Sequence, residues 1–285
     1  MKPIFLSIQA TYSTVHINLY QKETLLSSYS PQETRASSQL IPIINTLLKK
    51  HSLAITNLDF IAIDKGPGAF TSLRAAIATV NGIAFAQKIS LIGIDSLEAL
   101  AWETIEKNKG SQTPQTDLIV VLLNAYNNDV YFLLANTTNQ NKPEIREEGC
   151  CAIAHLIEKL NTMPISNVVI TGNGAELHHA LIKIKLRSNI TLHHLQQATP
   201  TAHAIGMLGL QKFSESKEPC YKIEPNYLKT QTFAIRATPN KPPRAASLTF
   251  SARTNRVAPP PNALPACPLP RESPTSPTPS QSINS

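Results

Sequence analysis

A glycine-rich stretch between a predicted strand and a predicted helix has residue types that could bind an anion. It reads Lys65-Gly66-Pro67-Gly68-Ala69-Phe70-Thr71-Ser72-Leu73-Arg74. Free backbone N–H groups at a helix N-terminus attract phosphate, and Thr71 is placed to cap that helix through its hydroxyl. The lysine, however, precedes the glycines, and the dinucleotide fingerprint needs glycine where Thr71 stands. The residues alone therefore favour a structural turn over a phosphate site.

Other chemistry-bearing residues lack the spacing of a metal or nucleophile site. His178-His179 and His193-His194 are adjacent pairs, not the i, i+4 pairs that share one helix face, and Cys150-Cys151 lacks the C-x-x-C spacing. There is no G-x-S-x-G motif, and the sequence gives Ser72 no neighbouring base. We expect structural or surface roles for these groups.

Two carboxylates end neighbouring predicted strands. Asp64 precedes the glycine-rich stretch and Asp95 follows the next strand along the chain. They could face one cleft as a pair, or each could cap the turn that follows its strand. Both alternatives are open, and neither assigns catalysis to these residues.

Hydrophobic periodicity predicts the elements that position these residues. In the first half the predicted strands are Ile4–Ala10, Val15–Tyr20, Thr24–Tyr29, Phe60–Asp64 and Ser90–Asp95, and the predicted helices are Ser37–His51, Phe70–Gln87 and Ser96–Lys107. This order requires a mixed sheet, beginning with an antiparallel meander and covered by helices.

The second half repeats the order of the first without repeating its letters. Its predicted strands are Asp117–Asn124, Asp129–Ala135, Glu144–Glu148, Asn167–Thr171 and Ile190–Leu195, and its predicted helices are Ala152–Leu160, Ala175–Leu186 and Thr201–Phe213. We predict a pseudo-duplicated α/β architecture with two lobes, residues 1–110 and 111–236.

The helix at residues 71–87 is unusual in its small residues. They occur on several faces, as Ala75, Ala76, Ala78, Gly82, Ala84 and Ala86. Small side chains let another helix approach closely. The helix is therefore either central in the core or packed against a partner on one side.

Residues 237–285 differ in composition from the rest of the chain. They hold 12 of the 22 prolines, and their five basic residues against one acidic residue supply +4 of the formal net charge of +7. We predict a disordered Pro/Ser-rich tail. The remaining +3 on residues 1–236 is poor evidence for nucleic-acid binding by the folded part.

The cysteines and the apolar runs indicate the compartment. Four cysteines, two of them adjacent, suggest no disulfide framework. Ile4-Phe5-Leu6 is too short for a secretory signal, and no run reaches the ~20 apolar residues of a membrane helix. We expect a soluble, cytoplasmic protein.

Several motifs resemble the bacterial TsaB (YeaZ) proteins, which take part in making threonylcarbamoyladenosine in tRNA. The strongest match is Gly66-Pro67-Gly68-Ala69-Phe70-Thr71, followed by Leu73-Arg74, which is similar to the family's G-P-G-S-F-T-G-[LV]-R. Weaker matches follow in the family's order: Asp95–Ala101, Asn124-Ala125 with Asp129-Val130-Tyr131, Gly172-Asn173-Gly174, and Pro225–Lys229. The resemblance covers about residues 3–231.

The resemblance implies an actin-like ATPase fold with two lobes and a role without catalysis of its own. TsaB-like proteins are partners of the related subunit TsaD, which transfers the threonylcarbamoyl group to the adenosine 3′ of the anticodon. A TsaE-like ATPase completes the pathway, tRNA is reached through the complex, and ATP and Mg²⁺ are used by the partner proteins. No cofactor is implied for this chain, and self-association when alone is an alternative.

The resemblance also suggests the interface. We expect the helices at residues 37–51 and 71–87 to pair with the equivalent helices of TsaD, with Gly66, Pro67, Gly68, Phe70, Thr71, Arg74, Ala78 and Gly82 as the motif turn and partner surface. The chain has Gln9-Ala10-Thr11 where the family usually has Asp-Thr-Ser, which argues against ATP chemistry of its own.

Three other functions compete with this interpretation. Two are enzymes of the same fold, a sugar-kinase-like phosphotransferase or an M22-type peptidase-like protein. The missing acidic residue near Gln9 argues against the first, and the missing helical histidine pair argues against the second. The third is a nucleic-acid binder acting through the basic tail, which lacks interleaved aromatic residues.

Overall fold

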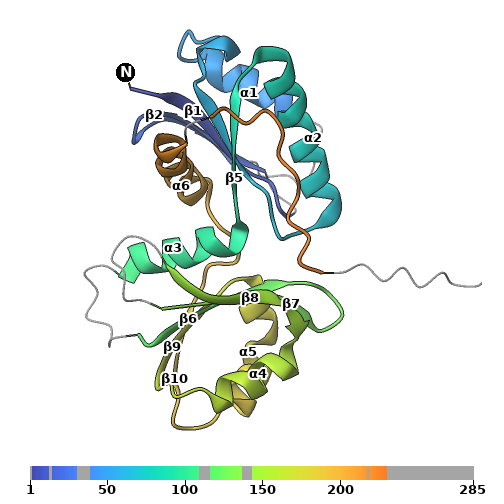
Figure 1. Ribbon diagram of the computed structural model, residues 1–285, viewed down its shortest axis with the longest axis vertical. Helices are drawn as coiled ribbons and strands as arrows, with labels where there is room; N and C mark the ends of the chain where they lie inside the picture. Colours follow the sequence, from blue (N-terminus) through green and yellow to red (C-terminus); the bar gives the residue numbers. More distant parts are fainter. Residues whose placement is uncertain are drawn as a thin grey trace, which may run out of the picture. The chain divides into compact units, whose positions relative to one another are not determined.

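Two mixed β-sheets organise the chain. The computed structural model describes residues 2–12, 15–30, 39–108, 116–136, 143–216 and 218–229. The first sheet has the strand order β3-β2-β1-β4-β5 (Figure 1). Its strands are β1 (Ile4–Gln9), β2 (His16–Gln21), β3 (Thr24–Tyr29), β4 (Phe60–Asp64) and β5 (Ser90–Ile94).

The second sheet repeats the topology of the first. Its order is β10-β9-β6-β7-β8, built from β6 (Leu118–Asn124), β7 (Asp129–Asn136), β8 (Glu144–Ala152), β9 (Asn167–Thr171) and β10 (Thr191–Leu195). In each sheet three antiparallel strands come first, and two further strands then add in parallel beside the first of them. The predicted duplication of a mixed α/β unit is confirmed, as is the actin-like fold class.

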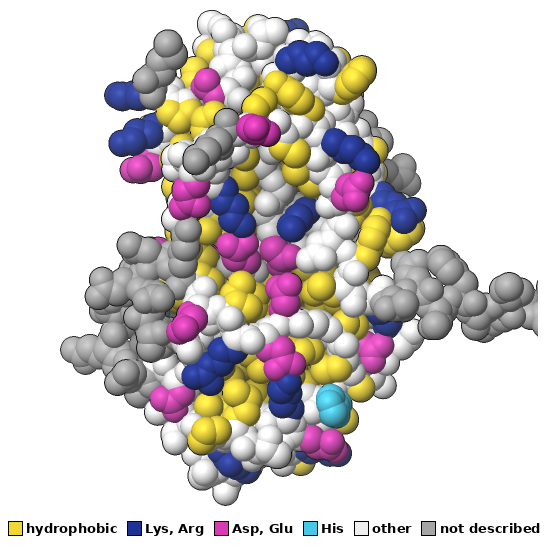
Figure 2. Space-filling view, in the orientation of Figure 1, with side chains coloured by type: hydrophobic (Ala, Val, Ile, Leu, Met, Phe, Trp, Pro, Cys, Tyr) yellow, Lys and Arg dark blue, Asp and Glu magenta, His cyan; other side chains and the backbone are white. Residues whose placement is uncertain are grey.

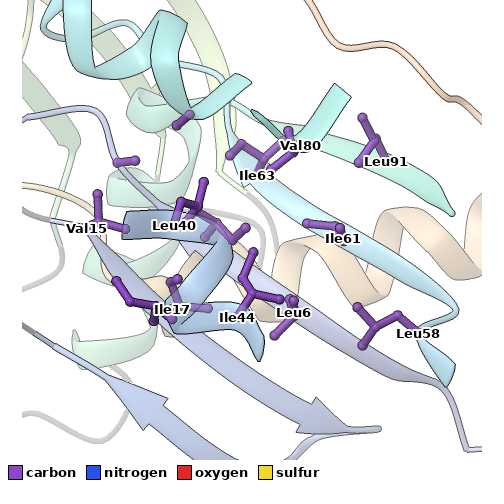
Figure 3. Close-up of a cluster of buried hydrophobic side chains, with 14 of the residues drawn as sticks. Leu6, Val15, Ile17, Leu40, Ile44, Leu58, Ile61, Ile63, Val80 and Leu91 are labelled. Carbon is purple, nitrogen blue, oxygen red and sulfur yellow. The ribbon is translucent and has the colours of Figure 1, made fainter. Parts of the chain in front are cut away.

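Two helices cover one face of the first sheet. They are α1 (Leu40–Lys49) and α2 (Phe70–Gln87), whose apolar residues recur at spacings of three and four. Figure 3 shows Leu40 and Ile44 of α1 and Val80 of α2 among side chains of the sheet. This core is continuous from β2 to β5, so the position of α2 is fixed by the apolar side chains beneath it.

The other face of the first sheet is covered by α6 (Ala202–Glu215), the last helix in sequence. It lies very close to the sheet, since a Cβ on Gly209 would be only 2.5 Å from the Cβ of Ala62. In return, α3 (Ser96–Asn108), which follows the first sheet, packs on β6 and β7 of the second. The two halves are therefore joined by an exchange of helices.

Helices α4 (Ile153–Thr162) and α5 (Asn173–Lys185) cover the remaining face of the second sheet. Their apolar residues meet the inward side chains of β6, β7 and β9. Among the described residues, no helix is both long enough and apolar enough to cross a membrane.

The observed ends of most helices and strands lie within four residues of the predicted ends. A short 3-10 helix, η2 (Ile55–Asn57), was not predicted. The prediction that Thr71 caps α2 is wrong, because the helix begins at Phe70, its N-cap is Ala69, and no side chain caps it. The predicted tail at 237–285 lies outside the described residues, and the lobe boundaries stay a prediction.

Two glycines provide a stability test with opposite expected outcomes. We expect Gly209→Ala to lower the free energy of unfolding by about 1–3 kcal/mol, because the added methyl would overlap Ala62. Gly82→Ala, on the exposed side of α2, meets no heavy atom within 4 Å and should raise it by about 0.5–1 kcal/mol. Urea unfolding followed by circular dichroism measures both, and equal effects would contradict the proposed helix–sheet packing.

Candidate functional site

A fully buried carboxyl group anchors the glycine-rich turn. Asp64 ends β4 and accepts hydrogen bonds from three groups: the Thr11 hydroxyl at 2.9 Å, the Ser96 hydroxyl at 2.5 Å and the Gly66 amide at 2.9 Å. Thr11 follows β1 and Ser96 begins α3. One side chain therefore ties the ends of two strands to the start of a helix.

The turn itself is pressed against the segment after β1. Gly66 has φ +94°, which favours glycine, and the Gly66–Pro67 peptide is cis. A Cβ on Gly68 would lie 2.6 Å from the Thr11 carbonyl oxygen, which also accepts a 2.6 Å hydrogen bond from the Ala69 amide. The structural turn favoured by the sequence is thus formed by Gly66, Pro67 and Gly68. This turn sets where α2 begins.

The second carboxylate caps the next helix. Asp95 accepts hydrogen bonds from the Leu97 amide at 2.8 Å and from the Asn226 side-chain amide at 2.6 Å. Its burial raises the pKa of this carboxyl. Of the two alternatives drawn from the sequence, capping of the following turn describes both Asp64 and Asp95.

Burial dominates the electrostatics of Asp64. Desolvation raises the pKa of its carboxyl to about 7, although the hydrogen bonds from Ser96, Gly66 and Thr11 act in the opposite direction. The negative charge of Asp95 contributes a smaller increase. The carboxyl therefore changes its protonation state near neutral pH.

The segment after β1 does not fit the magnesium nucleotide of actin-like kinases. Gln9 stands where an acidic residue would be needed, and its side-chain amide donates to Thr11. The Tyr12 ring packs against the apolar cluster of α3, β6 and β7, and burial raises the pKa of its hydroxyl. Gly68 is in turn closed against Thr11. The segment itself supplies no acidic ligand and no open phosphate loop, and the neighbouring Asp64 carboxyl is fully buried and already bonded to Thr11, Gly66 and Ser96.

Phe70 and Arg74 lie together at the start of α2. The Arg74 guanidinium is 3.7 Å from the centroid of the Phe70 ring, and its Nε donates a 2.6 Å hydrogen bond to the Tyr227 hydroxyl. Thr71 is exposed beside them. Tyr227 belongs to residues 218–229, which run along α2 in Figure 1 and are bonded to it again through Asn81 and Ile223.

Ala78 and Gly82 lie on the exposed side of α2, where they line a shallow groove. The groove has a volume of about 390 Å³ and is lined by Ile41, Ile55, Ala78, Thr79, Gly82, Ile83, Ala86 and Gln87. Its walls are almost entirely apolar, and Ile41 of α1 is 52% exposed. The structure therefore separates the predicted site residues into a turn, an aromatic–arginine cluster and an apolar groove, all along α2.

Sequence reasoning overlooked two members of this surface. Ile41 lies off the buried stripe of α1, and Phe85 of α2 is 73% exposed. Large apolar residues outside the helical stripe are the signal that could have identified them. The histidine pairs lie elsewhere, with His179 stacked on His194 at 4.8 Å, and the described residues contain no cluster of three or more metal-ligating side chains.

The carboxyl of Asp64 provides a pH test of this geometry. Its pKa in the folded protein is higher than in the unfolded chain, so the stability that it contributes is full below about pH 4 and is lost as the pH rises to about 7. We expect Asp64→Asn to remove this dependence, since the amide can donate to Thr11 and accept from Gly66. The free energy of unfolding is measured between pH 4 and 8. It should fall more steeply with rising pH in the native chain than in the variant, by up to ~1.4 kcal/mol per pH unit. Parallel pH profiles would contradict the assignment.

Comparison with known proteins identifies the family of this chain. The family model described as "TsaD: tRNA N6-adenosine threonylcarbamoyltransferase" matches residues 30–257. The TsaB protein of Buchnera aphidicola subsp. Acyrthosiphon pisum is 28% identical over 147 residues, which are 52% of this chain and 63% of the relative. TsaB of Bacillus subtilis is 23% identical, with 79% of this chain and 93% of the relative covered.

A solved structure agrees with the fold. YeaZ from Pseudomonas aeruginosa superposes with a TM-score of 0.63 at 18% identity, covering 79% of this chain and all of the YeaZ chain. The match to the Buchnera protein spans less than two thirds of that relative's length. Because the family model covers most of the sequence, the chain belongs to the TsaD family of tRNA N6-adenosine threonylcarbamoyltransferases, and within it to the TsaB (YeaZ) proteins.

Proposed function

We propose that this chain is a non-catalytic partner subunit in the formation of threonylcarbamoyladenosine at the adenosine 3′ of the anticodon in tRNA. It binds a TsaD-like threonylcarbamoyltransferase through the exposed face of α1 and α2 and activates it as a scaffold. Family membership supports the pathway, and the small-residue groove on α2 supports the mode of binding.

The groove is the main support for the proposal, because the packing of the described chain does not require its small residues. Gly82 faces open space, since a Cβ there would meet no heavy atom within 4 Å. Ala78, one turn earlier, is likewise exposed. Small residues on an exposed helix face let the backbone of a second helix approach closely. The exposed Ile41 and Phe85 supply apolar area for the same contact.

The absence of catalysis in the proposal rests on the segment after β1. A phosphotransferase of this fold would hold magnesium nucleotide there, whereas Gln9 and the packed Tyr12 ring occupy that place. The same observation weighs against the sugar-kinase alternative. We propose that ATP and Mg²⁺ are used by partner proteins, among them a TsaE-like ATPase, and that tRNA is reached through the complex in the cytoplasm.

A substitution in the groove tests the interface. Ala78→Glu and Gly82→Glu should each abolish co-purification with the cognate TsaD-like subunit, because a carboxylate would be buried in an apolar contact without a partner. The measurement is recovery of the complex after affinity capture and size-exclusion chromatography.

Glu is chosen because both sites are exposed, so the fold should tolerate it. Thermal unfolding within a few degrees of the native chain would show this. Ile184→Glu, at an 81% exposed position of α5, is the matched control and should leave the complex intact. Undiminished recovery of both groove variants would rule out the proposed surface.

The pathway assignment has a separate test in the host. Removing the protein should lower threonylcarbamoyladenosine in total tRNA, as measured by mass spectrometry of nucleosides, and re-expression of the native chain should restore it. Calorimetry of the isolated protein with Mg²⁺-ATP should show no tight binding. Unchanged modification would refute the pathway role, and tight nucleotide binding would favour the kinase alternative.

A further inference from the structure

We propose that the α1–α2 face selects an acidic partner, namely an apolar helical surface carrying Asp or Glu at both ends of the groove. The inference rests on the proposed function, since it describes the chemistry of the subunit that binds there. It follows from the charges on these two helices and from how two of them are held.

Helices α1 and α2 themselves carry cations but no carboxylates. Neither helix contains a single Asp or Glu. Lys49 and Lys50 lie at the exposed end of α1, while Arg74 is the fifth residue of α2 and Lys88 is its C-cap. Over the molecular face drawn in Figure 2 as a whole, Lys and Arg are interspersed with Asp and Glu. One sign of charge around an apolar groove sets up a field that attracts the opposite sign.

Arg74 is held ready to bind a carboxylate. Its guanidinium lies over the Phe70 ring at 3.7 Å and bonds through Nε to Tyr227. The two terminal nitrogens have no acceptor among the described residues. An arginine whose position is fixed by ring stacking loses little further side-chain entropy when it binds a carboxylate with both nitrogens.

Lys88 has the corresponding position at the other end of α2. Its ammonium lies 4.8 Å from the centroid of the Phe85 ring and 5.9 Å from that of Tyr221. Each cation is thus held between one ring of α2 and one ring of residues 218–229. Within residues 218–229, Lys222 and Glu224 form a 2.8 Å ion pair, Lys229 pairs with Asp129, and Glu218 is an exposed carboxylate.

The groove lies between these two cations along the helix. Arg74 is one turn before Ala78, and Lys88 directly follows Gln87, the last lining residue on α2. Fourteen residues of α-helix separate the two cations by about 21 Å. A partner helix of similar length would therefore place its carboxylates near both of its ends and its apolar residues between them.

The same charges disfavour a second copy of this chain as the occupant. A two-fold dimer through this face would bring its own cations together around the groove, without any carboxylate from either pair of helices. Like charges at an interface reduce affinity, and the association rate as well. The heterologous acidic partner is therefore preferred to the homodimer.

Charge reversal tests the inference with the full-length chain and its cognate TsaD-like subunit. Arg74→Glu combined with Lys88→Glu should weaken the complex roughly tenfold or more at 50 mM NaCl, and the difference should shrink at 500 mM. The control combines Lys183→Glu with Lys185→Glu on the exposed side of α5, which changes the net charge equally. Affinity is measured by biolayer interferometry, and thermal unfolding verifies that each variant is folded.

The outcomes separate this inference from the proposed function. Equal weakening by both double variants would overturn it, because total charge would then be the cause. It would also fail if charge reversal had no effect while Gly82→Glu abolished binding, although the groove would then stand. If neither change affected binding, the proposed interface itself would fall. Self-association of the native chain that Gly82→Glu disrupts, detected by ultracentrifugation, would contradict the preference for an acidic partner.

Discussion

The burial of one carboxyl group constrains the rest of this structure. Asp64 lies with no solvent exposure where three segments meet, and its hydrogen bonds reach Thr11, Gly66 and Ser96. Burying such a group costs free energy, which hydrogen bonds to its oxygens reduce. The segment after β1, the glycine-rich turn and the start of α3 are thereby held together. The start of α2 follows from that arrangement, and the apolar core beneath the helix fixes the rest of its position.

Helix α2 uses small residues for two different purposes. On its buried side Ala76 and Ala84 let the helix lie close to the first sheet, within a core that Leu73 and Val80 fill. On its exposed side Ala78 and Gly82 leave a groove that no side chain of the described residues fills. A sequence shows only that a helix is rich in small residues, whereas the three-dimensional packing shows which of them the fold already uses.

This difference between local composition and three-dimensional packing explains how much of the fold and of the candidate site could be predicted from the sequence. Hydrophobic periodicity predicted the ends of α2 and β4 correctly, because the buried residues of each element follow the spacing of its own secondary structure. The cap at Thr71 was wrong because the close contact of Gly68 and Ala69 with Thr11 starts the helix earlier. Contacts between residues distant in sequence, such as Arg74 with Tyr227, leave no periodic signal and had to come from the structure.

The two halves of the chain are joined by the exchange of helices between the sheets and by the segment after β1. Here the Tyr12 ring of that segment packs into the core shared by α3, β6 and β7, and Lys229 is bonded to Asp129 of β7 at 2.7 Å. Contacts that join the halves in this way oppose a hinge motion. The arrangement of α1 and α2 does not depend on that junction, because both helices pack on the first sheet and share one apolar core with it.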